Sequence, residues 1–438
     1  MKRLIYQRIP AWLLLAIFGL IVVHAPLTVF IGARIPELAV GIKAWKEVLL
    51  VATVLLVGID VIRRKKLGLF VRDRLLQLAV GYALLHFILV VLLPQGIGAA
   101  LAGLAIDLRF IAYFAVVYIF LRIHPGYTRR FVMVGIGGAV VVLGFALVQM
   151  VLPKDALSVL GYGEKTIMPY MTVDKNPAYI RINSTMRGPN PLGAYAMMAL
   201  GGVVAYGVYK LRRLSRMRTS LLFEIITVGA FVALWASYSR SALIAAVVTV
   251  AIILAVRFGS RLDWRHWLGI SGAVLFVISA GILARDTPFI ANVVLHNNPT
   301  TGASIDSNTA HASSLSEGLV AMLRQPLGGG VGSTGSASLM GDMPTIIENQ
   351  LLFVAHESGW LGLAVFIWLL FEIFRRLWRR RRNWLGLTVF ASGVGMLVIG
   401  LILPVWVDDT VSIVWWGLAA IVLAKEGYYE RTTDKKTA

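Results

Sequence analysis

Residues 179–195 read YIRINSTMRGPNPLGAY, and the rest of the chain is organised around this stretch. It carries Arg181 and Arg187, then a Pro-Asn-Pro-Leu-Gly turn, and it leads directly into an apolar segment. Ionisable side chains at the edge of an apolar span are costly in lipid and are candidates for function. The stretch therefore indicates where a polar loop enters a membrane, and it provides the first candidate binding site.

Composition sets the class of protein. The chain has 438 residues, of which 58% are hydrophobic and 15% are charged. A soluble chain of this length contains fewer apolar residues, so the composition predicts a single polytopic membrane domain. The chain has no cysteine, which excludes a disulfide framework, a thiolate metal site and a thiol nucleophile.

Apolar runs predict an all-α integral membrane protein with about twelve transmembrane helices. A helix needs roughly 20 apolar residues to cross about 30 Å of hydrocarbon. The runs of this length lie near residues 11–32, 45–62, 75–94, 97–121, 131–152, 190–209, 220–236, 240–257, 267–284, 351–374, 384–404 and 405–424. The first run has no small-residue cleavage site, so we expect a retained helix and not a signal peptide.

Basic residues alternate with these runs and predict the orientation. Of the 42 lysines and arginines, 30 fall on one side of the predicted membrane. These basic segments are residues 1–8, 63–74, 122–130, 210–218, 257–265, 375–382 and the C-terminal tail. The positive-inside rule then predicts that both termini are cytoplasmic. The net charge of +20 is explained by contact with anionic membrane lipids, and not by a nucleic-acid partner.

The two long connections, 153–189 and 285–350, fall on the opposite, non-cytoplasmic side. Loops longer than about 15 residues in a compact protein are usually functional. Both loops are rich in glycine, serine, threonine, asparagine and proline, and the second contains an amphipathic helical pattern at 311–325. We therefore expect the functional site on this side.

Arg181, Arg187 and Arg240 are the strongest candidates for binding a ligand. A guanidinium is always charged and donates two parallel hydrogen bonds to phosphate or carboxylate oxygens. Several arginines from different helices would form a metal-free cradle for a diphosphate, although headgroup contact or structural pairing is the alternative. Asn190 is a candidate N-cap with Pro191 at the first helical position, and such a helix start favours an anion. A plain helix start fits the same residues.

Two residues are candidates for a general base. Glu348 lies near the start of the predicted helix 351–374, where it could accept a proton or simply complement the helix dipole. His311, in the loop 285–350, could also act as a base or mark a solvated helix start.

The run QPLGGGVGSTGSAS at 325–338 contains Gly328, Gly330 and Gly332. It is not a dinucleotide fingerprint, because no strand precedes it, and it lacks the Gly-Lys-Ser/Thr of a P-loop. Either a loop that passes close to a ligand or a flexible connector fits these residues.

Asp107 and Arg109 lie within one predicted helix and face different sides of it, so each needs a partner on another helix. Glu357 also lies deep in an apolar run and needs a polar partner. No cluster of histidines and acids has metal-ligand spacing.

Four motifs in order resemble the O-antigen ligase / O-antigen polymerase (Wzy) superfamily. The first is Arg, Ser-Thr and Pro-Asn-x-x-Gly, here Arg181, Ser184-Thr185, Pro189-Asn190 and Gly193. The next two are Ser-Arg-Ser-Ala at 239–242 and Pro-x-Gly-x-Gly within Pro326–Gly332. The last is a [His/Glu]-Asn-x-x-Leu…Glu-x-Gly-x-x-Gly run, here Glu348-Asn349, Leu352, Glu357, Gly359 and Gly362.

The resemblance implies a GT-C-like glycosyltransferase of the bacterial inner membrane that needs no metal or cofactor. It would take glycan from undecaprenyl diphosphate and pass it to an acceptor hydroxyl on the periplasmic face. In this family the arginines stabilise the departing diphosphate and a base deprotonates the acceptor. Arg181, Arg187, Arg240 and Asn190 would bind the diphosphate, and Glu348 or His311 would be the base.

This chain departs from the ligases of the family, which usually carry histidine where Glu348 stands. The departure favours a polymerase, or a ligase for another polysaccharide. Two other functions remain open. A transporter or flippase of lipid-linked glycan would need inverted repeats, broken helices and acidic residues at the midplane. Only the charged residues Asp107 and Arg109 fit this function, and the long, asymmetric outer loops do not. A non-enzymatic assembly scaffold would need no catalytic residue.

Overall fold

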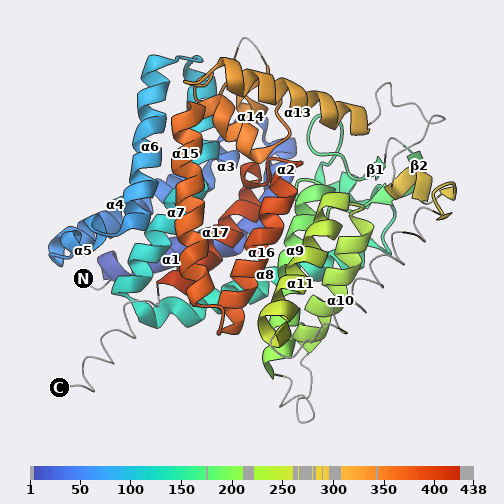
Figure 1. The fold of residues 1–438 in the computed structure, drawn as a ribbon, viewed down its shortest axis with the longest axis horizontal. Helices are drawn as coiled ribbons and strands as arrows, with labels where there is room; N and C mark the ends of the chain where they lie inside the picture. Colours follow the sequence, from blue (N-terminus) through green and yellow to red (C-terminus); the bar gives the residue numbers. More distant parts are fainter. Residues whose placement is uncertain are drawn as a thin grey trace.

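The computed structural model describes residues 4–173, 176–210, 221–259, 265, 279, 283–288, 290–294, 307–341 and 344–424. Within these ranges the chain is almost entirely helical (Figure 1). Among the described residues, seven helical segments are long and apolar enough to cross a membrane, and three shorter apolar helices accompany them. The protein is therefore an all-α, multi-pass membrane protein, as the composition predicts.

The long helices follow the apolar runs closely. They are α1 (Ile9–Leu20), α2 (His24–Arg34), α4 (Trp45–Arg63), α6 (Arg74–Leu92), α7 (Ile97–Ile123), α8 (Thr128–Gln149), α9 (Pro189–Lys210), α10 (Leu221–Ala236), α11 (Arg240–Phe258), α15 (Gln350–Arg379), α16 (Trp384–Gly400) and α17 (Asp409–Leu423). Eleven of the twelve predicted runs coincide with described helices. The twelfth, 267–284, lies almost entirely outside the described residues.

Short elements connect them. These are α3 (Ala39–Lys43), α5 (Leu67–Val71), α13 (Ser307–Arg324), α14 (Gly335–Ser338), the strands β1 (Met171–Val173) and β2 (Asn176–Arg181), and turns of 3-10 or π-helix at Leu4–Arg8, Ile21–Val23, Pro36–Leu38, Pro125–Tyr127, Ala156–Leu160, Ile290–Val294 and Val405–Val407. The amphipathic pattern at 311–325 is confirmed as α13. The strands pair antiparallel, with Met171 opposite Arg181.

The first predicted run is one membrane segment, Ile5–Arg34, but it is not one continuous α-helix. A 3-10 turn at Ile21–Val23 separates α1 from α2. Pro26 explains the interruption, because proline has no N–H to donate to the carbonyl of Val22. The break places His24 among the buried polar side chains.

The bundle has two distinct ends, which we call the loop end and the basic end. The loop end carries α13, which packs on α15, and the strands β1 and β2 (Figure 1). At the basic end, Asp73 receives hydrogen bonds from Arg122 at 2.8 Å and Arg376 at 2.9 Å. Because these residues lie on α6, α7 and α15, the three helix ends are tied together.

The core is built around α17, which packs most closely on α7 and also touches α16, α15 and α8. Trp406, Trp415 and Trp416 are fully buried there, with ring centroids 5.0 to 5.9 Å apart. Helix α9 packs on α10, α11 and α16 in the other half of the bundle. The stretch 179–195 therefore enters the bundle through α9.

Candidate functional site

Arg181 is held at the loop end by two neutral oxygens. Its Nε donates to the carbonyl of Ser237 at 2.7 Å, and its Nη2 donates to Oδ1 of Asn190 at 2.6 Å. These partners lie on the α10–α11 turn and on the first turn of α9, so one guanidinium joins three segments. Asn190, predicted as an N-cap and as a diphosphate ligand beside Arg181, instead accepts a hydrogen bond from Arg181 itself.

The residues after Arg181 are fastened to α8 and α10. The N–H of Ile182 donates to the carbonyl of Ala236 at 3.1 Å. The N–H of Ser184 donates to the side chain of Gln149 at 2.7 Å, and the Ser184 hydroxyl donates to the carbonyl of Val142 at 2.6 Å. Ser184 has φ +50°, a left-handed conformation that is costly without glycine. These bonds fix the loop that orients Arg181.

Helix α9 begins two residues earlier than an Asn190 N-cap requires. The helix starts at Pro189, so Asn190 lies inside the first turn and uses its side chain to hold Arg181. Pro189 and Pro191 both lack an N–H, which removes two of the donors that a helix start normally offers. The N-cap prediction is therefore wrong, and this helix start is a weaker anion site than the sequence suggested.

Arg240 begins α11, three residues after Ser237, whose carbonyl accepts a hydrogen bond from Arg181. Tyr238, within this turn, has φ +46°. Gly193 of α9 allows the turn to pack closely, since a Cβ there would lie 2.8 Å from the Ala242 Cβ and 3.0 Å from the Ser237 Oγ. Gly193 therefore has a packing role, and the segments that carry Arg181, Asn190 and Arg240 meet at one turn.

A hollow of about 270 Å³ lies beside Arg181, and we call it the arginine cavity. Polar and aromatic side chains line it together with apolar residues from 150–157 and 180–182: Gln149, Lys154, Tyr170, Arg181, Trp235 and Tyr238. Arg187, Asn190 and Arg240 do not line it. Lys154, Tyr170, Trp235 and Tyr238 are the residues that sequence reasoning missed.

The cavity combines positive charge with aromatic rings. Lys154 Nζ lies 5.5 Å from the centre of the Tyr170 ring, and Tyr179 meets Tyr238 edge to face at 6.5 Å. Burial, and secondarily the neighbouring Tyr179, raises the pKa of Tyr238, so its phenol stays protonated near neutrality. Such a wall suits a ligand that carries both an anionic group and a sugar-like or apolar face.

Arg187 belongs to another part of the loop end. Its side chain is exposed, and its charge interacts with Asp408, which caps α17 by accepting from the N–H of Val411 at 2.9 Å. The structure therefore directs Arg187 toward the α16–α17 connection and not into the arginine cavity.

Glu348 lies just before α15, under α13. Its N–H donates to the Ser314 hydroxyl of α13 at 2.9 Å, and its side chain is half-buried. Asn349, the N-cap of α15, accepts from the N–H groups of Leu351 and Leu352. His311 lies within α13, but its side chain is outside the described part of the structure.

The glycine-rich run packs against helix backbones. Gly328, Gly330 and Gly332 all have positive φ, from +83° to +98°. A Cβ on Gly332 would lie 2.2 Å from the Ala99 carbonyl oxygen of α7, and one on Gly330 would lie 2.5 Å from the Leu93 carbonyl oxygen. These approaches favour a structural role for the glycines over the flexible-connector interpretation.

Glu357 holds the same run from inside the bundle. Its carboxylate accepts from the N–H groups of Gly332 at 2.8 Å and Thr334 at 3.1 Å, which supplies the predicted polar partners. Asp107 lies beside Glu357, and His86 Nε2 lies 3.6 Å from the Asp107 Oδ2. This group is a buried polar cluster between α6, α7 and α15.

Arg109 faces a second cluster, as its spacing from Asp107 predicts. It lies 3.7 Å from Glu47 and donates to the carbonyl of Val407. Asp409 completes the cluster, with its Oδ2 3.1 Å from His24 Nε2 and 3.2 Å from Lys46 Nζ. Buried charges of this kind are tolerated because each has an opposite partner.

Within the described ranges, no group of three or more histidines and acids is placed to hold a metal ion. No protein-family model matches the chain, and no curated protein matches it. The candidate site therefore depends on its own geometry, in which Arg181, Lys154 and an aromatic wall meet beside the turn that begins at Ser237.

Proposed function

We propose that this protein is a membrane glycosyltransferase that transfers or polymerises glycan from a polyprenyl-diphosphate-linked donor. The observation that supports it is the position of Arg181, fixed by Ser237 and Asn190 at the wall of the arginine cavity. A guanidinium that is already oriented binds phosphate oxygens without paying the ordering entropy on binding. Lys154 adds positive charge to the same cavity.

The aromatic side chains of the cavity would bind the sugar of the donor. Tyr170, Trp235 and Tyr238 line the cavity with Arg181, so a diphosphate held by the cations would present its sugar to ring faces and phenol groups. Cavities with apolar walls and a few polar groups fix the orientation of a ligand in this way. The donor is thus recognised at both its anionic and its sugar portions.

The proposed reaction is displacement at the anomeric carbon. An acceptor hydroxyl forms the new glycosidic bond, the bond from the anomeric carbon to the diphosphate oxygen breaks, and the diphosphate leaves with the electron pair. Arg181 stabilises the charge on the leaving group from the cavity wall, which lowers the barrier. Arg240 does not line the cavity, and it would add charge from the start of α11, three residues after Ser237. Glu348 accepts the hydroxyl proton, with His311 as the alternative base.

The proposed orientation places the loop end in the periplasm of a bacterial inner membrane. Its support is the concentration of arginine and lysine at the basic end, including residues 63–66 and 375–382. Lipid-linked donor and acceptor glycan would then reach the arginine cavity from the outer leaflet, without a nucleotide or metal.

The test is product formation by the reconstituted protein with a lipid-linked oligosaccharide. We expect Arg181→Ala and Arg240→Ala each to reduce the rate by about 100-fold or more, the usual effect of removing one group that stabilises transition-state charge. Arg324→Ala is the matched control, because Arg324 is an exposed arginine at the end of α13.

Wild-type turnover by folded Arg181→Ala would exclude the proposal. A scaffold would give a different result, in which the arginine variants leave the polymer unchanged while the amount of a partner protein falls.

A transporter is the second candidate because of the two buried polar clusters. Asp107, Glu357 and His86 lie together in the interior, and α15 is interrupted at Gly359, where φ is +66°. Buried ionisable groups beside a broken helix are typical of transport sites. Flux of lipid-linked glycan through proteoliposomes, without any new glycosidic bond, would favour this function.

A further inference from the structure

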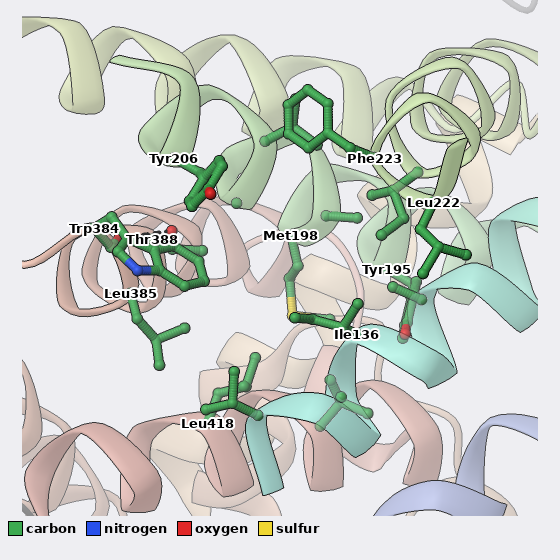
Figure 2. A pocket seen from close by; sticks show the side chains of 18 of the residues that line it. Ile136, Tyr195, Met198, Tyr206, Leu222, Phe223, Trp384, Leu385, Thr388 and Leu418 are labelled. Atoms are coloured by element: carbon green, nitrogen blue, oxygen red, sulfur yellow. Dashed lines mark hydrogen bonds between the residues drawn. The ribbon is translucent and has the colours of Figure 1, made fainter. Parts of the chain in front are cut away.

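A second hollow, of about 430 Å³, lies between α8, α9, α10, α16 and α17 and is almost entirely apolar. Figure 2 shows Tyr195 and Met198 of α9, Ile136 of α8 and Leu418 of α17 turned toward it. We call it the apolar pocket. Its volume is within the about 300–1,000 Å³ that is usual for ligand pockets. Its lining does not overlap with that of the arginine cavity.

The pocket occupies the half of the bundle nearest the basic end. On α8, α10 and α16 its lining residues come from the first turns of the helices, such as Val132, Leu222 and Trp384. On α9 they run from Tyr195 to Tyr206, which is about 16 Å along a helix axis. This length is about half of the roughly 30 Å hydrocarbon core, so the pocket matches one leaflet.

Aromatic side chains mark the level of the membrane surface at its mouth. Tyr206 meets Trp384 edge to face at 5.3 Å and lies 6.0 Å from the ring of Phe223. Tyrosine and tryptophan gather where the hydrocarbon meets the headgroups. The pocket therefore begins at the headgroup level and extends toward the bilayer centre.

The ends of the same helices carry positive charge. Lys210 Nζ lies 5.9 Å from the Tyr206 ring, and Arg129 and Arg130 occupy the first turn of α8. Three further arginines, Arg380, Arg381 and Arg382, directly precede α16. The single acid in the segments 128–132, 206–210, 221–226 and 380–388 is Glu224. Helices α8, α10 and α16 also begin here, and helix starts favour anions.

We propose that the apolar pocket binds one acyl chain of an anionic phospholipid from the leaflet at the basic end. The apolar wall and one-leaflet length fit the chain, while Lys210, Arg129 and Arg130 attract the phosphate of the headgroup. The charge selects an anionic lipid over a neutral one, because each basic residue near a membrane surface contributes to binding. This inference does not depend on the proposed glycosyltransferase activity.

The experiment uses the detergent-purified full chain. Native mass spectrometry identifies the lipid that stays bound, and thermal unfolding is measured with phosphatidylglycerol or with phosphatidylcholine of the same acyl chains. We expect retained anionic phospholipid, and a rise in the unfolding temperature with phosphatidylglycerol that phosphatidylcholine does not reproduce.

Ala199→Phe fills the pocket, since Ala199 lines it and is partly exposed to it. We expect loss of the retained lipid and of the phosphatidylglycerol effect. Ala251→Phe makes the same change on the exposed side of α11, outside the pocket, and should change neither.

Lys210→Gln and Arg130→Gln keep the apolar wall and should each weaken lipid binding about fivefold. The same change at the exposed Arg72, Arg72→Gln, should not weaken it.

Several results would overturn the inference. Equal stabilisation by the two lipids would remove the role of charge. An unchanged lipid complement in Ala199→Phe would place the lipid elsewhere. A retained polyprenyl lipid, or a second copy of the chain bound in place of phospholipid, would assign the pocket to that occupant. If Ala199→Phe does not fold, the fivefold weakening by Lys210→Gln still decides between these outcomes.

Discussion

The stretch 179–195 and the glycine-rich run 325–338 both leave the loop end and re-enter the bundle, but they use their polar groups differently. In the first, a permanent positive charge is positioned by the neutral oxygens of Ser237 and Asn190 at the wall of a cavity. In the second, the backbone donates to the carboxylate of Glu357 and presses against the carbonyls of α6 and α7. The first arrangement places the charge of Arg181 at the wall of a cavity, and the second is used in packing.

Backbone conformation separates the two regions in the same way. Positive φ in the run 325–338 falls on glycines, for which it carries little cost. At the candidate site it falls on Ser184 and Tyr238, where each left-handed residue costs about 1–3 kcal/mol. Such strain persists where surrounding contacts fix the geometry, and it concentrates at functional sites. The comparison therefore supports the proposed binding role of the first region and a packing role for the second.

The largest expected effect comes from the packing region. Gly332→Val adds a side chain where a Cβ would lie 2.2 Å from the Ala99 oxygen, at φ +86°. Strain and overpacking together should cost about 4 kcal/mol of unfolding free energy. The measurement is the fraction of monodisperse protein after heating in detergent. Gly137→Ala, in α8 with no atom within 4 Å of a Cβ, is the control and should retain stability. A stable Gly332→Val would show that the run is not a packing element.

A smaller effect is expected at the arginine cavity, on activity alone. Lys154→Ala removes a cation from the cavity wall. Because Lys154 lies in the segment after α8 and not in the helical core, the unfolding temperature should stay unchanged. Loss of one charged contact to a phosphate should lower the rate at limiting donor concentration about tenfold. Lys165→Ala, an exposed lysine of the same loop, should leave the rate unchanged. If Lys154→Ala destabilises the protein without altering turnover, the cavity belongs with the packing region.

Most of the helical framework could be predicted, because length and apolar content are local properties of the sequence. The opposite faces of Asp107 and Arg109 were likewise predictable, since helix geometry fixes them. Their partners, His86 for Asp107 and Glu47 for Arg109, lie on other helices far away in the sequence. No local pattern identifies them.

The candidate site was predictable in part. The sequence identified Arg181 and Asn190 as neighbours at one site, but it did not predict the hydrogen bond that joins them. Lys154 was missed because the cavity forms only when the segment after α8 folds back onto β2 and the α10–α11 turn. The Asn190 N-cap was wrong because the helix starts at Pro189, two residues before the predicted Pro191. Local rules describe each segment, while the cavity depends on how distant segments pack.

The smallest effect is expected at the basic end, where stability should depend on pH through His124. Burial lowers the pKa of His124 below its usual 6.5, although a hydrogen bond to Asp60 at 3.0 Å opposes the shift. The unfolded chain then binds more protons than the folded one just below pH 6.5, so stability is complete above that pH and falls as the pH decreases through it. Chemical unfolding at pH 7.5 and 5.5 measures the loss, which should be smaller in His124→Gln because that side chain does not titrate. An equal loss in both proteins would assign the pH dependence to other groups. An arginine-based site has no such dependence near neutrality, since a guanidinium keeps its charge. The pH dependence of stability therefore distinguishes the binding region from the packing regions in a way that the substitutions at Gly332 and Lys154 do not.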